Sequence, residues 1–410
     1  MGNWKELTVG DLCDTISDTY HRNDDEVVLV NTSDVLEGKI LNHQTVENKN
    51  LKGQFKKTFK KDDILYSEIR PANKRYAYVD FEETERYIAS TKLMVLRPKK
   101  DLVLPRFLFA FLSSNHVLAE LQHLAETRSG TFPQITFSSE LAPMPIALPD
   151  FETQEKIVGM LSSVEGRIQN NNEINENLEQ QARALFQSMF ITSEERFSWE
   201  GGVFADLIDS TLGGDWGKES PTGNNTEMVY CIRGADIPEV RAGNKGKMPT
   251  RYILPKNYAA KRLLPGDIVV EISGGSPTQS TGRVAAISQS LLDRYDKGMV
   301  CTNFCKAIKP KAGYSMFIYY YWQYLYDRNV FFLYENGTTG IKNLDLSGFI
   351  TTEEIVIPPS HLVKRFDDYC QIIFDQIFAN GLENEQLAAI RDTLLPRLMS
   401  GEIDVSQLSI

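Results

Sequence analysis

The sequence predicts an α/β protein in which two similar mixed α/β globules are separated by two long helices packed as an antiparallel coiled coil, with pseudo-two-fold symmetry. Three observations predict this fold. The chain has 410 residues, enough to bury two or three complete cores. A set of short phrases occurs twice in the same order, about 209 residues apart. Each copy then runs into a long polar helix with a heptad pattern.

The repeated phrases begin with "VGDLCDTISD" from Val9 and "FADLIDSTLG" from Phe204. They continue with "FKKDDILYSEIRPANKRYAYV" and "LLPGDIVVEISGGSPTQSTGRVAAI", and later with "STKLMVLRPK" and "CTNFCKAIKPK". The alternative is that turn and strand-end residues common to all α/β proteins recur by accident, but chance rarely keeps so many phrases in the same order. We therefore predict globular domains at residues 1–150 and 196–359. Long helices are expected at 151–195 and at 360–410, the second with a C-terminal tail.

Each long helix carries one heptad seam. Stepping by four and three residues from Ile157 meets mostly apolar positions, and the second helix repeats the pattern from Phe366 with one rough step at Arg391. The seam positions that we assign are Leu161, Val164, Ile168, Asn171, Asn175, Leu178 and Leu185 in the first helix and Ile373, Ile377, Asn380, Asn384, Leu387 and Leu394 in the second.

Both seams carry two asparagines near the helix midpoint, Asn171 with Asn175 and Asn380 with Asn384. In an antiparallel pair the midpoints meet, so these amides are expected to hydrogen-bond across the seam, which costs stability and sets the register. The alternative is that they are solvated where the helices splay apart. A helix of about 34 residues is about 50 Å long. A rigid spacer with a similar domain at each end suits a partner with approximate two-fold symmetry, such as duplex DNA.

Composition and motifs argue against several classes of protein. The five cysteines form no CxxC pair, which disfavours a zinc site or a disulfide framework and fits a reducing cytoplasm. The aromatic stretch "YSMFIYYYWQYLYDRNVFFLY" is interrupted by polar residues and indicates a buried helix rather than a membrane span. No phosphate-binding loop, HExxH or GxSxG motif is found in the sequence, so we expect neither a catalytic residue nor a bound metal.

Basic segments are the most informative feature for binding, although the formal net charge is -11. The segment "LKGQFKKTFKK" at 51–61 holds lysines, aromatics and no acid, and the segment from Arg241 to Arg262 is also without an acidic residue. Each cluster precedes the same "DI" strand, at Asp63 and at Asp267. The alternative is a solvated lysine face on an acidic protein. We predict contacts to DNA phosphates or bases from Lys56, Lys57, Lys60, Lys61, Arg70, Lys74, Arg75, Thr131, Gln134, Lys245, Lys247, Arg251, Lys261, Arg262, Arg283, Thr338 and Lys342.

The first helical segment is acidic. Between Phe151 and Glu195 it carries many glutamates and only Lys156, Arg167 and Arg183 as basic residues. An acidic helix repels DNA, so this surface is better suited to a protein partner.

The whole set of phrases resembles the specificity subunit of type I restriction-modification systems. The resemblance rests on the two-fold repeat, "DILYSEIRP", "GDIVVEISGGSPTQSTGR", "SGTFPQI", "NGTTGIKNL", "ALPDFETQEKIV" and the ending "LLPRLMSGEIDV", and it covers essentially the whole chain. One departure is "PPSHLVKRFDDY" in the second half, which lacks the pair seen at Gln154 and Glu155. That end of the second helix is therefore expected to contact its partner differently.

The resemblance implies a non-catalytic subunit of a DNA methyltransferase and endonuclease complex, located in the cytoplasm. Its two target-recognition domains would each read half of a split double-stranded DNA sequence. Its helices would set the gap and dock modification subunits, which hold S-adenosylmethionine and methylate adenine. Restriction and translocase subunits would use ATP and Mg, leaving no cofactor on this chain. The alternatives are a stand-alone sequence-specific DNA-binding regulator without enzyme partners, or a scaffold whose rod joins partners.

Overall fold

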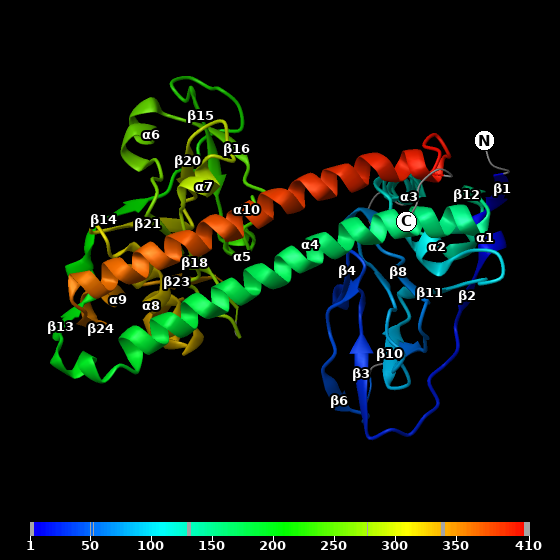
Figure 1. The fold of residues 1–410 in the computed structure, drawn as a ribbon, viewed down its shortest axis with the longest axis horizontal. Helices are drawn as coiled ribbons and strands as arrows, with labels where there is room; N and C mark the ends of the chain where they lie inside the picture. The colour runs from blue at the N-terminus through cyan, green and yellow to red at the C-terminus, as the bar shows by residue number, and fades with distance from the viewer. Residues whose placement is uncertain are drawn as a thin grey trace. The chain divides into compact units, whose positions relative to one another are not determined.

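The computed structural model describes residues 4–49, 51, 53–128, 133–276, 278–337 and 341–405. The chain divides into two compact units, each of which is described by itself (Figure 1). Unit 1 comprises Met1–Gly166 with Leu387–Ile410, and unit 2 comprises Arg167–Gln386.

Unit 1 is built on two four-stranded sheets. One sheet has the order β2 (Cys13–Ile16), β11 (Leu93–Pro98), β8 (Ile64–Ser67) and β9 (Tyr76–Tyr78), all antiparallel. The other has the order β6 (Thr45–Glu47), β3 (Glu26–Val30), β10 (Tyr87–Ser90) and β7 (Phe55–Lys57), and within it β3 and β10 are parallel. Short ladders join β1 (Lys5–Thr8) to β12 (Pro145–Leu148) and β4 (Val35–Leu36) to β5 (Lys39–Ile40).

Helices complete the core of unit 1. These are α1 (Val9–Leu12), α2 (Pro105–Leu112) and α3 (Asn115–Arg128), together with the parts of the long helices that belong to this unit. Phe107 of α2 is fully buried and belongs to the same apolar cluster as Leu161 and Leu398. The amphipathic side of α2 thus ties the sheet to the start of one long helix and the end of the other.

Unit 2 repeats this plan. Its main sheet has the order β14 (Ile208–Gly213), β21 (Cys305–Pro310), β17 (Ile268–Glu271) and β19 (Val284–Ala286), again antiparallel. Its second sheet places β15 (Glu227–Ile232) between β16 (Thr250–Ile253) and β20 (Met299–Cys301), and β15 and β20 are parallel. The terminal ladder joins β13 (Glu200–Val203) to β24 (Glu354–Ile357). The internal duplication predicted from the repeated phrases is therefore confirmed in strand order and pairing.

The remaining elements of unit 2 are a third small sheet and several helices. The sheet has the order β18 (Ser273–Gly274), β23 (Lys342–Leu344) and β22 (Glu335–Asn336). The helices are α5 (Ile237–Arg241), α6 (Pro255–Lys261), α7 (Gln289–Leu292), α8 (Ser315–Asp327) and α9 (Leu346–Thr352). The aromatic helix α8 is buried, with Trp322 and Phe317 almost inaccessible, as its interrupted apolar pattern predicts. Among the described residues, none of the helices combines the length and apolar character needed to cross a bilayer.

Two long helices end the two halves of the repeat. Helix α4 (Phe151–Phe186) continues into a π-helical turn at Gln187–Ile191, and α10 (Ser360–Met399) runs almost to the end of the described chain. Within unit 2 the later part of α4 packs antiparallel against the earlier part of α10 (Figure 1), because residues with rising numbers in one contact residues with falling numbers in the other. This confirms the predicted antiparallel coiled coil.

Candidate nucleic-acid interface and its helical support

The asparagines of the two seams form a buried polar layer in unit 2. Asn171 donates its amide to Asn384 at 2.9 Å, and Asn380 donates to Asn175 at 2.8 Å. All four side chains are at least nine-tenths buried. Asn384 also donates to Asn172 at 2.9 Å. Since each amide pairs with one particular opposite residue, a shift of one heptad would leave buried amides unpaired, and the layer sets the register.

The same layer holds the loop that follows α5 against the helices. Asn175 donates to the carbonyl oxygens of Ala242 at 3.2 Å and of Ile377 at 3.1 Å. Gly243 follows with a φ of 84°, and a Cβ on Gly381 would lie only 1.9 Å from its carbonyl oxygen. Two glycines thus permit a close backbone approach that other residues would block. Sequence reasoning missed this joint, because a heptad pattern says nothing of which loop covers it.

The other predicted seam positions lie along the same inner faces. Ile373 and Ile377 are buried, and the remaining apolar seam residues are buried or half-buried: Leu161, Val164, Ile168, Leu178, Leu185, Leu387 and Leu394. Their assignment as a continuous seam between the two helices stays a prediction.

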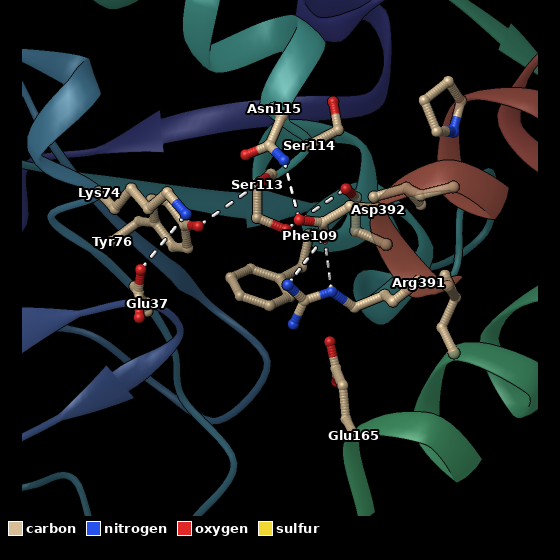
Figure 2. Close-up of a pocket in the computed structure, with 14 residues that line it drawn as sticks. Glu37, Lys74, Tyr76, Phe109, Ser113, Ser114, Asn115, Glu165, Arg391 and Asp392 are labelled. Atoms are coloured by element: carbon tan, nitrogen blue, oxygen red, sulfur yellow. Dashed lines mark hydrogen bonds and ion pairs between the residues drawn. The ribbon is translucent and has the colours of Figure 1, made fainter. Parts of the chain in front are cut away.

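The rough step at Arg391 lies in unit 1 beside a cavity of about 160 Å³ (Figure 2). Its guanidinium donates to Asp392 at 2.8 and 2.9 Å, and Asp392 also accepts from Asn115 at 3.0 Å. Glu165 of α4 points toward the guanidinium in Figure 2. Neighbouring protein atoms desolvate this carboxyl group and raise its pKa, although Glu165 as a residue is exposed, and the charges of Arg391 and Arg106 offset only part of the effect.

Gln154, which marks the difference between the two helix starts, is buried inside unit 1. Its side chain accepts from the backbone of Leu104 at 2.8 Å and donates to the carbonyl of Pro149 at 2.9 Å. It therefore links the residue before α2 to the segment that leads into α4. A side chain that is only 1% exposed is not available to a partner protein.

The two "DI" strands begin with the same buried carboxylate. Asp63 accepts from the Lys60 backbone at 2.7 Å and pairs with Arg97 of β11 at 2.7 Å. Asp267 accepts from the Leu264 backbone at 2.8 Å and pairs with Lys309 of β21 at 2.7 Å. These bonds fix the turn before each strand, so the residues just ahead of it are held at defined positions on the surface.

The first basic cluster divides into exposed and engaged side chains. Lys56, Lys60 and Arg70 are exposed and form no ion pair with any residue that the structure describes. Lys57 is half-buried and donates to the carbonyl of Leu93 at 2.8 Å, and burial lowers the pKa of its amine. The others are bonded within unit 1: Lys61 to Glu82, Lys74 to Glu37, Arg75 to the Ser33 and Val35 carbonyls, and Gln134 through a β-bridge to Ile69. Thr131 lies outside the described residues.

The second cluster divides in the same way. Lys247 and Arg262 are exposed, and neither has an ion pair within the described part of the chain. Arg251 lies 4.0 Å over the Trp216 ring, and Lys245 lies 4.6 Å over the Tyr295 ring. The rest are bonded within unit 2: Lys261 to the Gly214 carbonyl, Arg283 to Glu271 through two bonds, and Lys342 to Glu335. Thr338 lies outside the described residues. The predicted DNA contacts stay predictions, and the exposed cations are the ones free to meet phosphate.

Sequence reasoning also missed two aromatic side chains of unit 2. Phe304 is 61% exposed and Trp216 is 38% exposed, and both line one cavity. Each stands alone in a short turn, "GGDWGK" and "TNFC", so no periodic pattern marks it. The signal in the sequence is an aromatic residue within a short polar turn.

Comparisons with known proteins agree with this geometry. Residues 1–180 match the family model described as the type I restriction modification DNA specificity domain. The chain is 29% identical over 487 residues to the type I restriction enzyme HindI specificity subunit of Haemophilus influenzae, covering 98% of this chain and 100% of that protein. It is 27% identical over 328 residues to the MjaIX specificity subunit of Methanocaldococcus jannaschii, covering 75% of this chain and 71% of that protein.

A solved structure supports the fold. The S subunit of a type I restriction-modification system from M. genitalium aligns with a TM-score of 0.51 and 15% sequence identity, covering 97% of this chain and 96% of that one. The matched family model is described as a DNA specificity domain, and both relatives are named as specificity subunits of type I restriction enzymes. The chain is thus similar, over nearly its whole length, to a specificity subunit of a type I restriction enzyme, and its first 180 residues match the family model of the DNA specificity domain.

Proposed function

We propose that this chain reads a bipartite double-stranded DNA target, with unit 1 addressing one half-site and unit 2 the other. The observation that supports this most is the duplication. The two units share the order and pairing of their main sheets, and each places a basic segment just before a strand whose first carboxylate is locked in place. Exposed cations on each unit then supply phosphate contacts, while neighbouring polar and aromatic side chains address base edges.

The long helices dock the partner subunits in this proposal. The exposed face of α4 carries Glu152, Glu155, Glu173 and Glu176, which repel DNA phosphates. Helix α10 exposes apolar side chains that a lone helix pair has no reason to leave in water: Ile372 is 71% exposed, Ile390 49% and Leu382 42%. Acidic and apolar groups on one pair of helices suit a protein surface.

The partners are adenine methyltransferase (modification) subunits and, with them, restriction and translocase subunits. S-adenosylmethionine would bind the modification subunits, and ATP with Mg would bind the restriction subunits. In this proposal the chain works in the cytoplasm and is the subunit that recognises the DNA sequence for the complex. Methylation requires that the target base leave the duplex stack. A subunit that binds both half-sites holds the duplex in place for that step.

The experiment that tests the proposal is to co-express this chain with the modification subunit encoded beside it and to map adenine methylation by single-molecule sequencing. A split motif with a constant gap is expected. A stand-alone regulator would bind DNA in a salt-sensitive way but would not co-purify with the modification subunit. A scaffold would co-purify without any sequence motif, and either result would overturn the proposal.

A further inference from the structure

Unit 2 contains a cavity of about 430 Å³ at one end of its two larger sheets. Its walls come from the segments that follow β14, β15 and β17 and from the turn between β20 and β21, including Trp216, Arg233, Glu271 and Phe304. The strands β15 and β20 are parallel, so both direct their carboxyl ends toward this cavity. In open α/β sheets, the carboxyl ends of parallel strands are where ligands bind.

The rim of the cavity presents aromatic rings to solvent. Phe304 is 61% exposed, and Trp216 keeps 38% of its surface exposed even though Arg251 stacks on its ring at 4.0 Å. Unlike singly exposed rings such as Phe197, these two lie together at one cavity. Aromatic platforms flanked by arginine are the arrangement on which unstacked nucleobases lie in nucleic-acid-binding proteins.

The wall of the cavity offers a polar group that the fold leaves unused. Thr302 is 2% exposed, and its hydroxyl has no oxygen or nitrogen partner among the described residues. The Cys305 thiol lies close enough for the hydroxyl to lower its pKa, but sulfur is a weak partner. Beside it the Asn303 side chain is exposed. Threonine and asparagine are side chains that bond base edges.

The charged groups of the cavity are already held in place. The Glu271 carboxylate accepts two bonds from Arg283, at 2.6 and 2.8 Å, and Arg233 pairs with Asp236 at 2.9 Å. Gly234 allows this close packing, since a Cβ there would lie 2.4 Å from a Glu271 oxygen. Arg251, which stacks on Trp216, is paired as well, with Glu219 at 3.5 Å, so the aromatic rings and the uncharged polar groups are what the cavity offers to a ligand.

Unit 1 carries a lysine at the place that corresponds to Phe304. The residue before β21 is Phe304, whereas the residue before β11, the corresponding strand of unit 1, is Lys92, which pairs with Glu68 at 3.3 Å. The duplicated fold therefore carries this chemistry in unit 2 and a salt bridge in unit 1. A difference at one position of a shared scaffold is expected where the two units recognise different DNA.

We propose that this cavity receives a nucleobase that leaves the duplex stack in the half-site bound by unit 2, with the base lying against Phe304 and Trp216 and its edge reaching Thr302 and Asn303. The proposal rests on the proposed function. It adds that unit 2 recognises one base of its half-site by taking that base out of the duplex, and not by contacting the base edge in a DNA groove.

The test uses the complex with its modification subunits and duplexes of the methylated motif, in which each nucleotide of the second half-site is replaced in turn by an abasic one. At one position, binding is expected to weaken about ten-fold in the native complex, the size of one lost base stack. Phe304→Ala should weaken binding to the intact duplex by a similar factor and abolish the extra loss at that position. Phe304→Trp should restore both the affinity for the intact duplex and the extra loss at that position. Phe197→Ala removes an equally large ring that is 89% exposed elsewhere in unit 2, and it should change neither of these two quantities.

A second duplex separates extrusion from contact in the groove. An abasic nucleotide opposite the extruded base removes the pairing that extrusion must break, so it should strengthen native binding a few-fold. Unchanged or weaker binding there would mean that Phe304 touches a stacked base, and this would overturn the proposal. The proposal is equally wrong if Phe304→Ala leaves the abasic profile unchanged. Loss of all sequence-specific binding by the native complex would instead remove the proposed function itself.

Discussion

In the buried asparagine layer, the side-chain amides of one helix hydrogen-bond to those of the other. We expect Asn380→Ala to lower the free energy of unfolding by about 1–3 kcal/mol, because the Asn175 oxygen then loses the donor that lies 2.8 Å away. Urea denaturation measures the change. Asn170→Ala, at an exposed position of the same helix, should cost less than about 0.5 kcal/mol. Equal effects of the two substitutions would show that the layer is solvated and does not set the register.

Glu165 gives a residue-scale prediction that depends on pH. Burial holds its pKa above the ordinary value of 4.5, so the folded state binds the proton more tightly than the unfolded state does. The carboxylate therefore lowers stability as pH rises through and above 4.5, and this cost is absent where both states are protonated. Glu165→Gln should raise the melting temperature at pH 7.5, with the gain shrinking to nothing below pH 4.5.

Glu176→Gln, on the same helix but outside the cavity that Glu165 lines, is the matched control for Glu165→Gln and should leave the melting temperature nearly unchanged at both pH values. A melting temperature of Glu165→Gln that falls at pH 7.5 would contradict the prediction. It would mean that attraction to Arg391, toward which Glu165 points in Figure 2, outweighs the cost of burial.

At the scale of elements, the exposed apolar face of α10 should decide partner binding. Ile372→Asp places a charge at a side chain that is 71% exposed, so folding should be unaffected while co-purification with the modification subunit falls at least ten-fold. Leu333→Asp, at a side chain that is 83% exposed in unit 2 but outside the long helices, is the control. Retained co-purification with Ile372→Asp would place the docking surface elsewhere.

The helices also predict how the gap between half-sites is measured. Removing residues 164–170 from α4 and 385–391 from α10 takes one heptad from each helix, keeps the asparagine pairs, and shortens the rod by about 10 Å. The methylated motif should then lose about three base pairs from its gap, at 3.4 Å per base pair, and keep both half-sites. Removing 164–170 alone leaves the facing residues unmatched and should destabilise the pair. An unchanged gap in the paired deletion would show that the length of the helices does not set the spacing between the half-sites.

Periodic features could be predicted from the sequence, and features assembled from distant segments could not. The heptads and repeated phrases led to the antiparallel helices and the duplicated sheets because each is a local pattern. The cavity at Phe304 and Trp216 unites several loops with no common spacing. Lys57 illustrates the limit for single residues, since the basic run does not reveal that this lysine donates to the Leu93 carbonyl, while its contact with DNA stays a prediction. Charge identifies a segment, and burial decides which of its side chains are free.

For the whole molecule, the duplication predicts that the two half-sites respond separately to mutation. Lys60→Glu reverses an exposed charge of unit 1, and Arg262→Glu reverses one of unit 2. Lys60→Glu is a cleaner test than Lys57→Glu, because the Lys57 amine is bonded within the unit. Each reversal should weaken binding about ten-fold to duplexes that keep only its own half-site, through lost phosphate attraction, and leave duplexes with only the other half-site unchanged.

The two reversals also discriminate between local recognition and general electrostatic attraction. If the acidic molecule, with its formal net charge of -11, simply repelled DNA more strongly after each substitution, both half-sites would lose affinity equally. Lys364→Glu, which reverses an exposed charge on α10, controls for this and should affect neither half-site. Affinity measured by fluorescence anisotropy at two salt concentrations should show a smaller salt dependence only for the half-site whose cation is lost. Separate effects would mean that each unit is a reader in its own right, whereas equal effects would confine sequence reading to groups outside the basic clusters.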